Sequence, residues 1–200
     1  MRHQTIHLDI TMAIFRWRTL WTSAILAVAC GQPGGGAAPV PVIALPIDRL
    51  YVLEAIGAPA DDTTFVLSAG QDRRVLIRHG APDNTPFAIL DFPASSLGHG
   101  PVTMVFRPLP GRAGAEIEVT RGSLSDSSAT ITFAYPQHFL APAGAVARFG
   151  SLLAYERALR IGYLAPGVSD VDLLPSTRPG SDLLRGPIPG PGRFLVAAPR

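Results

Sequence analysis

Lysine is absent from the sequence, because every one of its 17 basic residues is arginine. A Walker A phosphate loop, a Schiff-base lysine and a Ser-x-x-Lys nucleophile each require a lysine. These three kinds of site are therefore excluded. Cysteine is almost absent too, since Cys30 is the only one. A single cysteine excludes an internal disulfide bond and any metal site built from several thiolates.

After the N-terminal segment, the sequence has no net charge. Three of the 17 arginines and one of the 15 acidic residues precede Cys30, so 14 charges of each sign remain after it. Nucleic acid and anionic lipid headgroups are bound by clustered basic residues. The balanced charge predicts that nucleic acid is not a partner.

A short apolar run near the N-terminus predicts export. Arg16 and Arg18 precede the apolar run Thr19–Ala29, which has 11 residues and ends in small side chains. This order is typical of a signal peptide, and the run is shorter than the about 20 apolar residues of a membrane-spanning helix. We predict a helical signal peptide over residues 1–29 and an extracytoplasmic location, in the periplasm or on the outer surface. The proportions favour Met12 as the true start, the alternative being a longer n-region.

The residues around the cleavage site suggest a lipid anchor. Leu26, Ala29 and Cys30 resemble the lipobox of bacterial lipoproteins, although Ala27 stands where that pattern prefers Leu. The resemblance implies that Cys30 is lipidated and becomes the mature N-terminus. An ordinary signal peptidase would cut at the same place and leave the thiol free. Lipidation is favoured because a free exposed thiol is reactive on an exported protein.

Glycine and proline mark the start of the mature chain. They dominate residues 30–46, where we expect a tether without regular structure. Later glycines and prolines alternate with aliphatic residues, which favours turns between strands over disorder. We therefore expect residues 47–200 to form one β domain.

Alternating apolar and polar residues predict antiparallel strands in this domain. The pattern is clearest at Val102–Arg107, Ala115–Thr120 and Thr130–Tyr135. Short turn-rich segments separate these three runs, and we predict that they form a meander. Further strands are predicted at Leu50–Ile56, Thr64–Leu67, Arg74–Arg78, Phe87–Phe92, Val171–Leu174 and Arg193–Ala197.

Residues 145–164 fit both a helical and an extended pattern. Leu153, Tyr155 and Arg157 alternate as in a strand, whereas apolar residues between 146 and 153 also suit a helix face. We predict a short helix or turn at Ala145–Phe149 and then a strand. The spacing of strands predicts a mainly β fold, an antiparallel β-sandwich with at most one or two short helices.

The order of strands and turns resembles immunoglobulin-like sandwich modules of exported bacterial proteins. The resemblance is carried by Phe92–Ala94, the three central strands and Gly192–Ala197. It implies a binding or structural role in the cell envelope. We predict that the membrane is one partner, through lipid on Cys30. A second partner is expected to be an envelope protein recruited by an unpaired strand edge.

One segment points instead to an enzyme. Residues 75–80, which end in Arg78-His79-Gly80, resemble the signature of the histidine phosphatase family. The resemblance implies that His79 is the nucleophile and that Arg78 clamps the phosphate. That family has an α/β fold and a second histidine late in the chain, whereas helix-period segments are almost absent here. A histidine-phosphatase-like hydrolase is therefore kept as the alternative to a non-catalytic role.

Three histidines of the predicted β domain are candidate metal ligands. His79, His99 and His138 could together hold zinc, since imidazole is a common zinc ligand. They lack the paired spacing of known zinc motifs. The sequence therefore predicts neither a metal nor another cofactor.

Overall fold

The computed structural model describes residues 41–125, 128–135 and 137–200, and these belong to one compact unit. The predicted signal peptide, Met12, Cys30 and the tether up to residue 40 lie outside the described residues. Within the described part of the chain, neither helix has the length and apolar character to cross a membrane.

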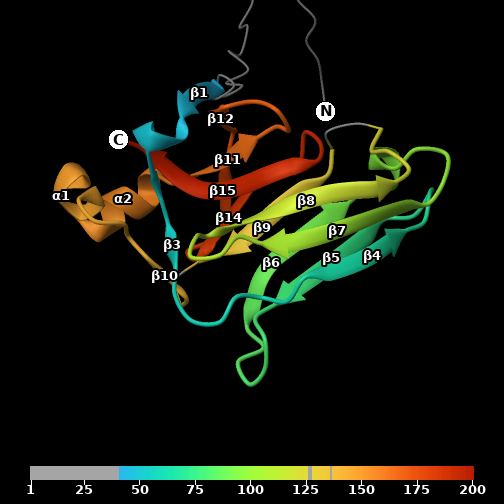
Figure 1. Cartoon of the computed structure of the whole chain (residues 1–200), viewed down its shortest axis with the longest axis horizontal. Helices are drawn as coiled ribbons and strands as arrows, with labels where there is room; N and C mark the ends of the chain where they lie inside the picture. The colour runs from blue at the N-terminus through green and yellow to red at the C-terminus, as the bar shows by residue number, and fades with distance from the viewer. Residues whose placement is uncertain (1–40, 126–127, 136) are drawn as a thin grey trace, which may run out of the picture. The chain divides into compact units, whose positions relative to one another are not determined.

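Two antiparallel sheets form the body (Figure 1). The larger sheet has eight strands in the order β1 (Ile43–Pro46), β12 (Asp170–Leu173), β11 (Arg160–Leu164), β15 (Gly192–Pro199), β8 (Gly114–Arg121), β7 (Val102–Pro108) and β4 (Thr63–Leu67), with β2 (Leu50–Val52) also paired to β15. The smaller sheet has the order β13 (Thr177–Gly180), β14 (Leu183–Pro187), β9 (Thr130–Ala134), β6 (Pro86–Phe92) and β5 (Arg73–Arg78).

Short elements complete the described part of the body. A two-stranded ribbon pairs β3 (Glu54–Ala55) with β10 (Phe139–Leu140). Two helices, α1 (Ala145–Phe149) and α2 (Leu152–Ala158), lie between β10 and β11, and single 3-10 turns occupy Ile47–Arg49 and Ala94–Ser96. The predicted mainly β sandwich with at most two short helices is therefore confirmed.

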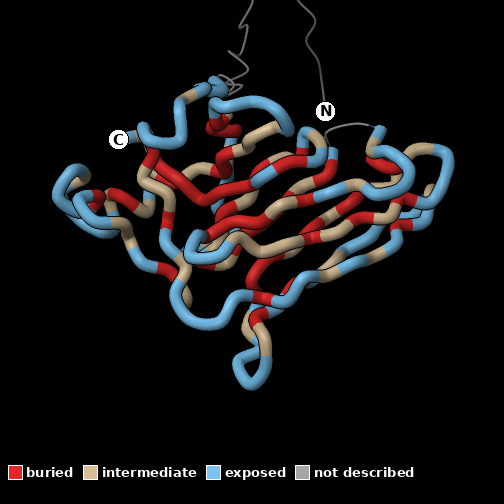
Figure 2. The backbone as a smooth tube through the Cα atoms, viewed as in Figure 1, coloured by how far each residue is buried: buried red, intermediate tan, exposed pale blue. Residues whose placement is uncertain are grey.

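Phenylalanine side chains join the two sheets. Phe87, on the smaller sheet, meets the edge of Phe106, on the larger sheet, with ring centroids 6.0 Å apart. It also meets Phe133 of the neighbouring strand at 5.8 Å. All three are almost completely buried. Figure 2 shows buried residues alternating with less buried ones along many of the strands, as expected where one face of a sheet covers a core.

The predicted meander is wrong. The runs at Val102–Arg107 and Ala115–Thr120 do pair with each other as β7 and β8. The third run becomes β9, which pairs with β6 and β14 in the other sheet. Both sheets cover the same core, so the strands on either side of a crossing connection show the same one-sided apolar pattern. That pattern fixes which face is buried but not which strand is the neighbour.

The boundaries of the predicted tether and of one strand also need correction. No regular structure is predicted before residue 47, but Ile43–Pro46 forms β1, which pairs with β12 and is an end strand of the larger sheet. The alternation at residues 153–157 indicated a strand, but Leu152–Ala158 is helix α2. The Ser151 hydroxyl accepts a hydrogen bond from the Ala154 backbone N–H at 3.1 Å and so caps this helix.

Burial of one side chain explains why this segment forms helix α2 and not a strand. Tyr155 is fully buried, and its hydroxyl donates to the Tyr51 carbonyl oxygen at 3.2 Å. Burial raises the pKa of Tyr155, because the charged phenolate is disfavoured away from water. The strand predicted to follow is present as β11. Besides β1, three described strands lie outside the predicted ones: β10, β13 and β14.

The sheets approach closely at Gly186 of β14. A Cβ atom there would lie 2.8 Å from Cγ1 of Ile161 in β11, a distance that packed carbon atoms do not adopt. We predict that Gly186→Ala lowers the free energy of unfolding by about 1–3 kcal/mol, as overpacking of a core does. Thermal or denaturant unfolding followed by circular dichroism measures this loss.

Gly100→Ala is the matched control, because a Cβ atom at Gly100 meets nothing within 4 Å. It should leave stability unchanged or slightly higher. Equal stability of the two variants would contradict the close approach of β14 and β11.

Candidate functional site

The loop that joins β5 to β6 carries the most unusual polar cluster in the described residues. The loop is closed by a hydrogen bond from the His79 backbone N–H to the Thr85 carbonyl at 2.9 Å. Within it, the Asp83 N–H donates to the Gly80 carbonyl at 3.2 Å. Asn84 adopts a positive φ of 53°, which asparagine tolerates better than most residues. The turn-forming sequence therefore places the Asp83 side chain close to the end of β5.

Strand periodicity separates Arg78 from His79. Side chains alternate between the two faces of a strand, and here Ile77 and His79 are buried whereas Arg78 is exposed. The Arg78 guanidinium donates to the Asn84 carbonyl at 2.7 Å. The two residues that the histidine phosphatase resemblance assigns to one phosphate site thus lie on opposite faces. The described residues also lack the long helices of that family's α/β fold, so the hydrolase alternative gains no support here.

His79 is buried in a defined orientation. The residue is only 4% exposed, and its Nδ1 lies 3.2 Å from the Ala58 carbonyl oxygen. A carbonyl oxygen can only accept a hydrogen bond, so Nδ1 carries the hydrogen in this contact. Nε2 of the same ring is buried and has no hydrogen-bond partner among the described residues. The ring therefore directs an unused lone pair into the protein.

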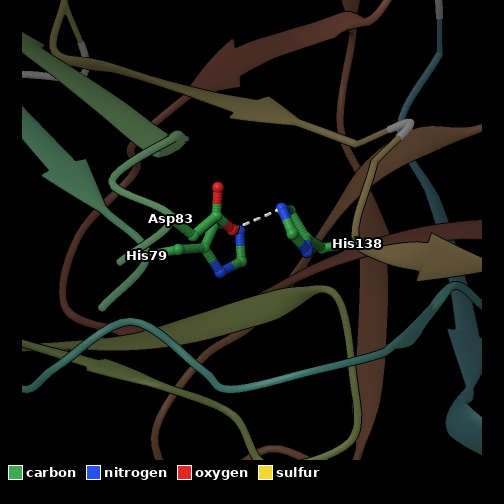
Figure 3. Close-up of side chains that lie close together, drawn as sticks. All are labelled: His79, Asp83 and His138. Atoms are coloured by element: carbon green, nitrogen blue, oxygen red, sulfur yellow. Dashed lines mark ion pairs between the residues drawn. The ribbon is translucent and has the colours of Figure 1, made fainter. Parts of the chain in front are cut away.

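His138 reaches the same place from the segment before β10. Its Nε2 lies 2.7 Å from Oδ2 of Asp83 and 3.2 Å from the hydroxyl of Thr85. Its ring centroid is 4.1 Å from that of His79, with 41° between the ring planes. Figure 3 shows His79 and Asp83 facing His138 across this short gap. One ligand atom from each of His79, Asp83 and His138 lies within 4.8 Å of the others.

The cluster lies at the boundary between core and solvent. Phe87 presents its edge to His79 with centroids 5.2 Å apart, and Phe139 lies 6.4 Å away. The side chains of Asp83 and His138 keep about a third and a quarter of their exposure, respectively. An apolar wall strengthens polar interactions made against it. The three side chains can thus bind a small polar or charged species that enters from solvent.

The predicted residues are only partly brought together. His79 and His138 meet although they are far apart in sequence. His99 is exposed just before β7, whose first residue pairs with Leu67 at one end of β4. His79 forms a bridge to Ala60, beyond the other end of β4. The three histidines are therefore not brought together, as their unpaired spacing indicated, but two of them meet. Asp83, for which the sequence carries no signal, completes the cluster.

Comparison with known proteins adds no assignment for this site. No family model, curated protein or solved structure matches the chain. The immunoglobulin-like resemblance of the sandwich accordingly stays a prediction, and the site is interpreted from its own geometry.

The hydrogen-bond geometry predicts the tautomers of the two histidines. We expect His79 to carry its hydrogen on Nδ1, because that atom faces a carbonyl, and His138 to carry one on Nε2, because that atom faces a carboxylate. Long-range ¹H–¹⁵N correlation spectra at neutral pH and without added metal distinguish the tautomers. A His79 ring with its hydrogen on Nε2 would contradict the orientation described above. His99, which is exposed, provides the solvent reference in the same spectra.

Proposed function

We propose that the protein is an exported, lipid-anchored cell-envelope protein whose β-sandwich is a binding module. The proposal for export and anchoring is supported by the apolar run Thr19–Ala29 and by Cys30 directly after it. The described body begins to form regular structure at Ile43. Residues 31–42 would span about 40 Å if fully extended, enough to separate a body from a membrane surface.

The observation that carries the binding role is the buried Nε2 of His79, which has no partner among the described residues. An unsatisfied buried polar atom costs about 1–3 kcal/mol. The His79 ring lies beside a carboxylate and a second imidazole that are partly open to solvent, and one ligand atom of each of the three residues lies within 4.8 Å of the others. A ligand bound by His79, Asp83 and His138 together would offset the cost of the unsatisfied nitrogen. Arg78 points away from the cluster, so binding fits the geometry better than phosphoryl transfer.

A protein partner in the envelope belongs to the same proposal. The two ends of the larger sheet path are β1 and β4, and those of the smaller sheet are β13 and β5. Arg73, Arg74 and Arg78 line β5, and charged edge residues discourage pairing with another strand. β4 carries the exposed Val66 and none of these arginines. Of these two edges, β4 therefore better supports recruitment of a partner strand.

The anchor is tested by replacing its attachment atom. We expect Cys30→Ala to abolish incorporation of labelled fatty acid and to release the protein from the membrane fraction of expressing bacteria. The reason is that Cys30 is the only cysteine, so no other thiol of the chain can carry the lipid. Fractionation with immunoblotting and acyl labelling measure both effects.

Ala27→Leu is the matched control, because it restores the residue that the lipobox prefers and should keep or increase labelling. Membrane partitioning of Cys30→Ala equal to that of the original chain would show that Cys30 is not the anchor.

A further inference from the structure

We propose that His79, Asp83 and His138 together bind one divalent transition-metal ion of the zinc class, with His79 binding through Nε2. This inference rests on the proposed binding role of the cluster and is independent of the lipid anchor. The residue types are ordinary zinc ligands: two imidazoles and one carboxylate. Calcium and magnesium prefer six or more oxygen ligands or retained waters, and the cluster offers too few oxygens for either.

The orientation of His79 is that of a metal ligand. Histidines that bind metals generally donate their other ring N–H to a carbonyl or carboxylate, which fixes the ring and leaves the ligating nitrogen unprotonated. His79 makes this contact from Nδ1 to Ala58. Its Nε2 is buried and unpartnered among the described residues. This buried, unpartnered nitrogen is an observation independent of the grouping of the three residues.

The spacing of the ligand atoms needs a small rearrangement, in which the Asp83 and His138 atoms separate slightly and both approach His79. Ligands at zinc–nitrogen and zinc–oxygen distances of about 2.0–2.2 Å stand about 3.3 Å apart in a tetrahedral site. The Asp83 carboxylate and His138 Nε2 are now 2.7 Å apart, and the full set lies within 4.8 Å. Asp83 and His138 sit on connecting segments and are partly exposed, so they can shift toward the fixed His79. Zinc would replace the Nε2 hydrogen that joins His138 to Asp83, and the ring would then carry its hydrogen on Nδ1. A neutral ring reaches this state by a change of tautomer, whereas a doubly protonated ring releases one proton to solvent.

The surroundings favour a site with one position left open. Phe87 and Phe139 lie against the His79 ring, while the exposed parts of Asp83 and His138 provide a path for entry. The Thr85 hydroxyl contacts the same Nε2 of His138, and metal binding through Nε2 would replace this contact. Three protein ligands leave the fourth tetrahedral position for water or for a group from a bound molecule. Copper binds such ligands more tightly than zinc does, so metal identity is tested by competition.

Zinc binding can be measured on the full chain after removal of metal by a chelator. We expect one zinc ion per chain in competition with a chromophoric chelator. At a free zinc concentration 100 times the Kd, the melting temperature should rise by about 5–10 °C. Added cobalt should give the visible absorption of a four- or five-coordinate ion with nitrogen and oxygen ligands. Copper should displace it.

Two variants remove ligands at the partly exposed side of the site, where substitutions are least disruptive. Asp83→Asn and His138→Ala should each weaken zinc binding at least tenfold and abolish the thermal shift. His99→Ala is the matched control for the loss of an imidazole, and His3→Ala combined with His7→Ala controls for the N-terminal histidines. These controls should bind zinc as the original chain does.

Several outcomes would overturn the assignment. Absence of zinc binding at micromolar concentrations would do so, as would unchanged affinity in Asp83→Asn. Loss of binding in the His99 or N-terminal control would place the metal elsewhere. If His138→Ala fails to fold, Asp83→Asn with a circular dichroism spectrum equal to that of the original chain still decides the question. Because Cys30→Ala addresses only anchoring, failure of the zinc site and failure of the envelope proposal give different results.

Discussion

The contact between Phe87 and Phe106 is the constraint on which the body and its site both depend. It joins the smaller sheet to the larger one across the core. The same Phe87 ring also packs against His79, with centroids 5.2 Å apart. A change in the separation of the sheets would therefore move His79 relative to Asp83 and His138. The end of the sandwich is thus a place where apolar packing fixes the direction of a polar ring, a condition that a preformed binding site requires.

Local pattern was enough to find most of the strands but not their partners. Alternation located β7, β8 and β9 because each has one apolar face, yet it could not show that β9 lies in the other sheet. Residues 152–158 have an alternating pattern and still form a helix, because the Ser151 cap and burial of Tyr155 favour it. β14 was missed since its glycine and proline resemble a turn. Its Gly186 is instead required where β14 approaches Ile161.

The sequence pointed to two of the residues of the site but not to the fact that they meet. The apolar strand ending at Arg78 correctly placed His79 at a strand end, and His138 was considered as a ligand. Their meeting depends on the pairing of β3 with β10 and on the bridge from His79 to Ala60, which are long-range contacts. Asp83 was not predicted, because an aspartate after a proline is typical of an ordinary turn. Spacing in sequence carries little information about ligands that come from separate connections.

The cost of the buried His79 nitrogen gives the strongest reason to treat the cluster as functional. An apolar side chain of similar size would fill the position beside Phe87 and Phe139 without an unsatisfied atom. The neighbouring contact between Asp83 and His138 is partly exposed, and even a fully charged pair at such a place contributes only about 0–1 kcal/mol. Structural stability alone therefore does not account for two imidazoles and a carboxylate at this end of the sandwich. A ligand that engages Nε2 does, since binding removes the penalty and ties the β5–β6 loop to the segment before β10.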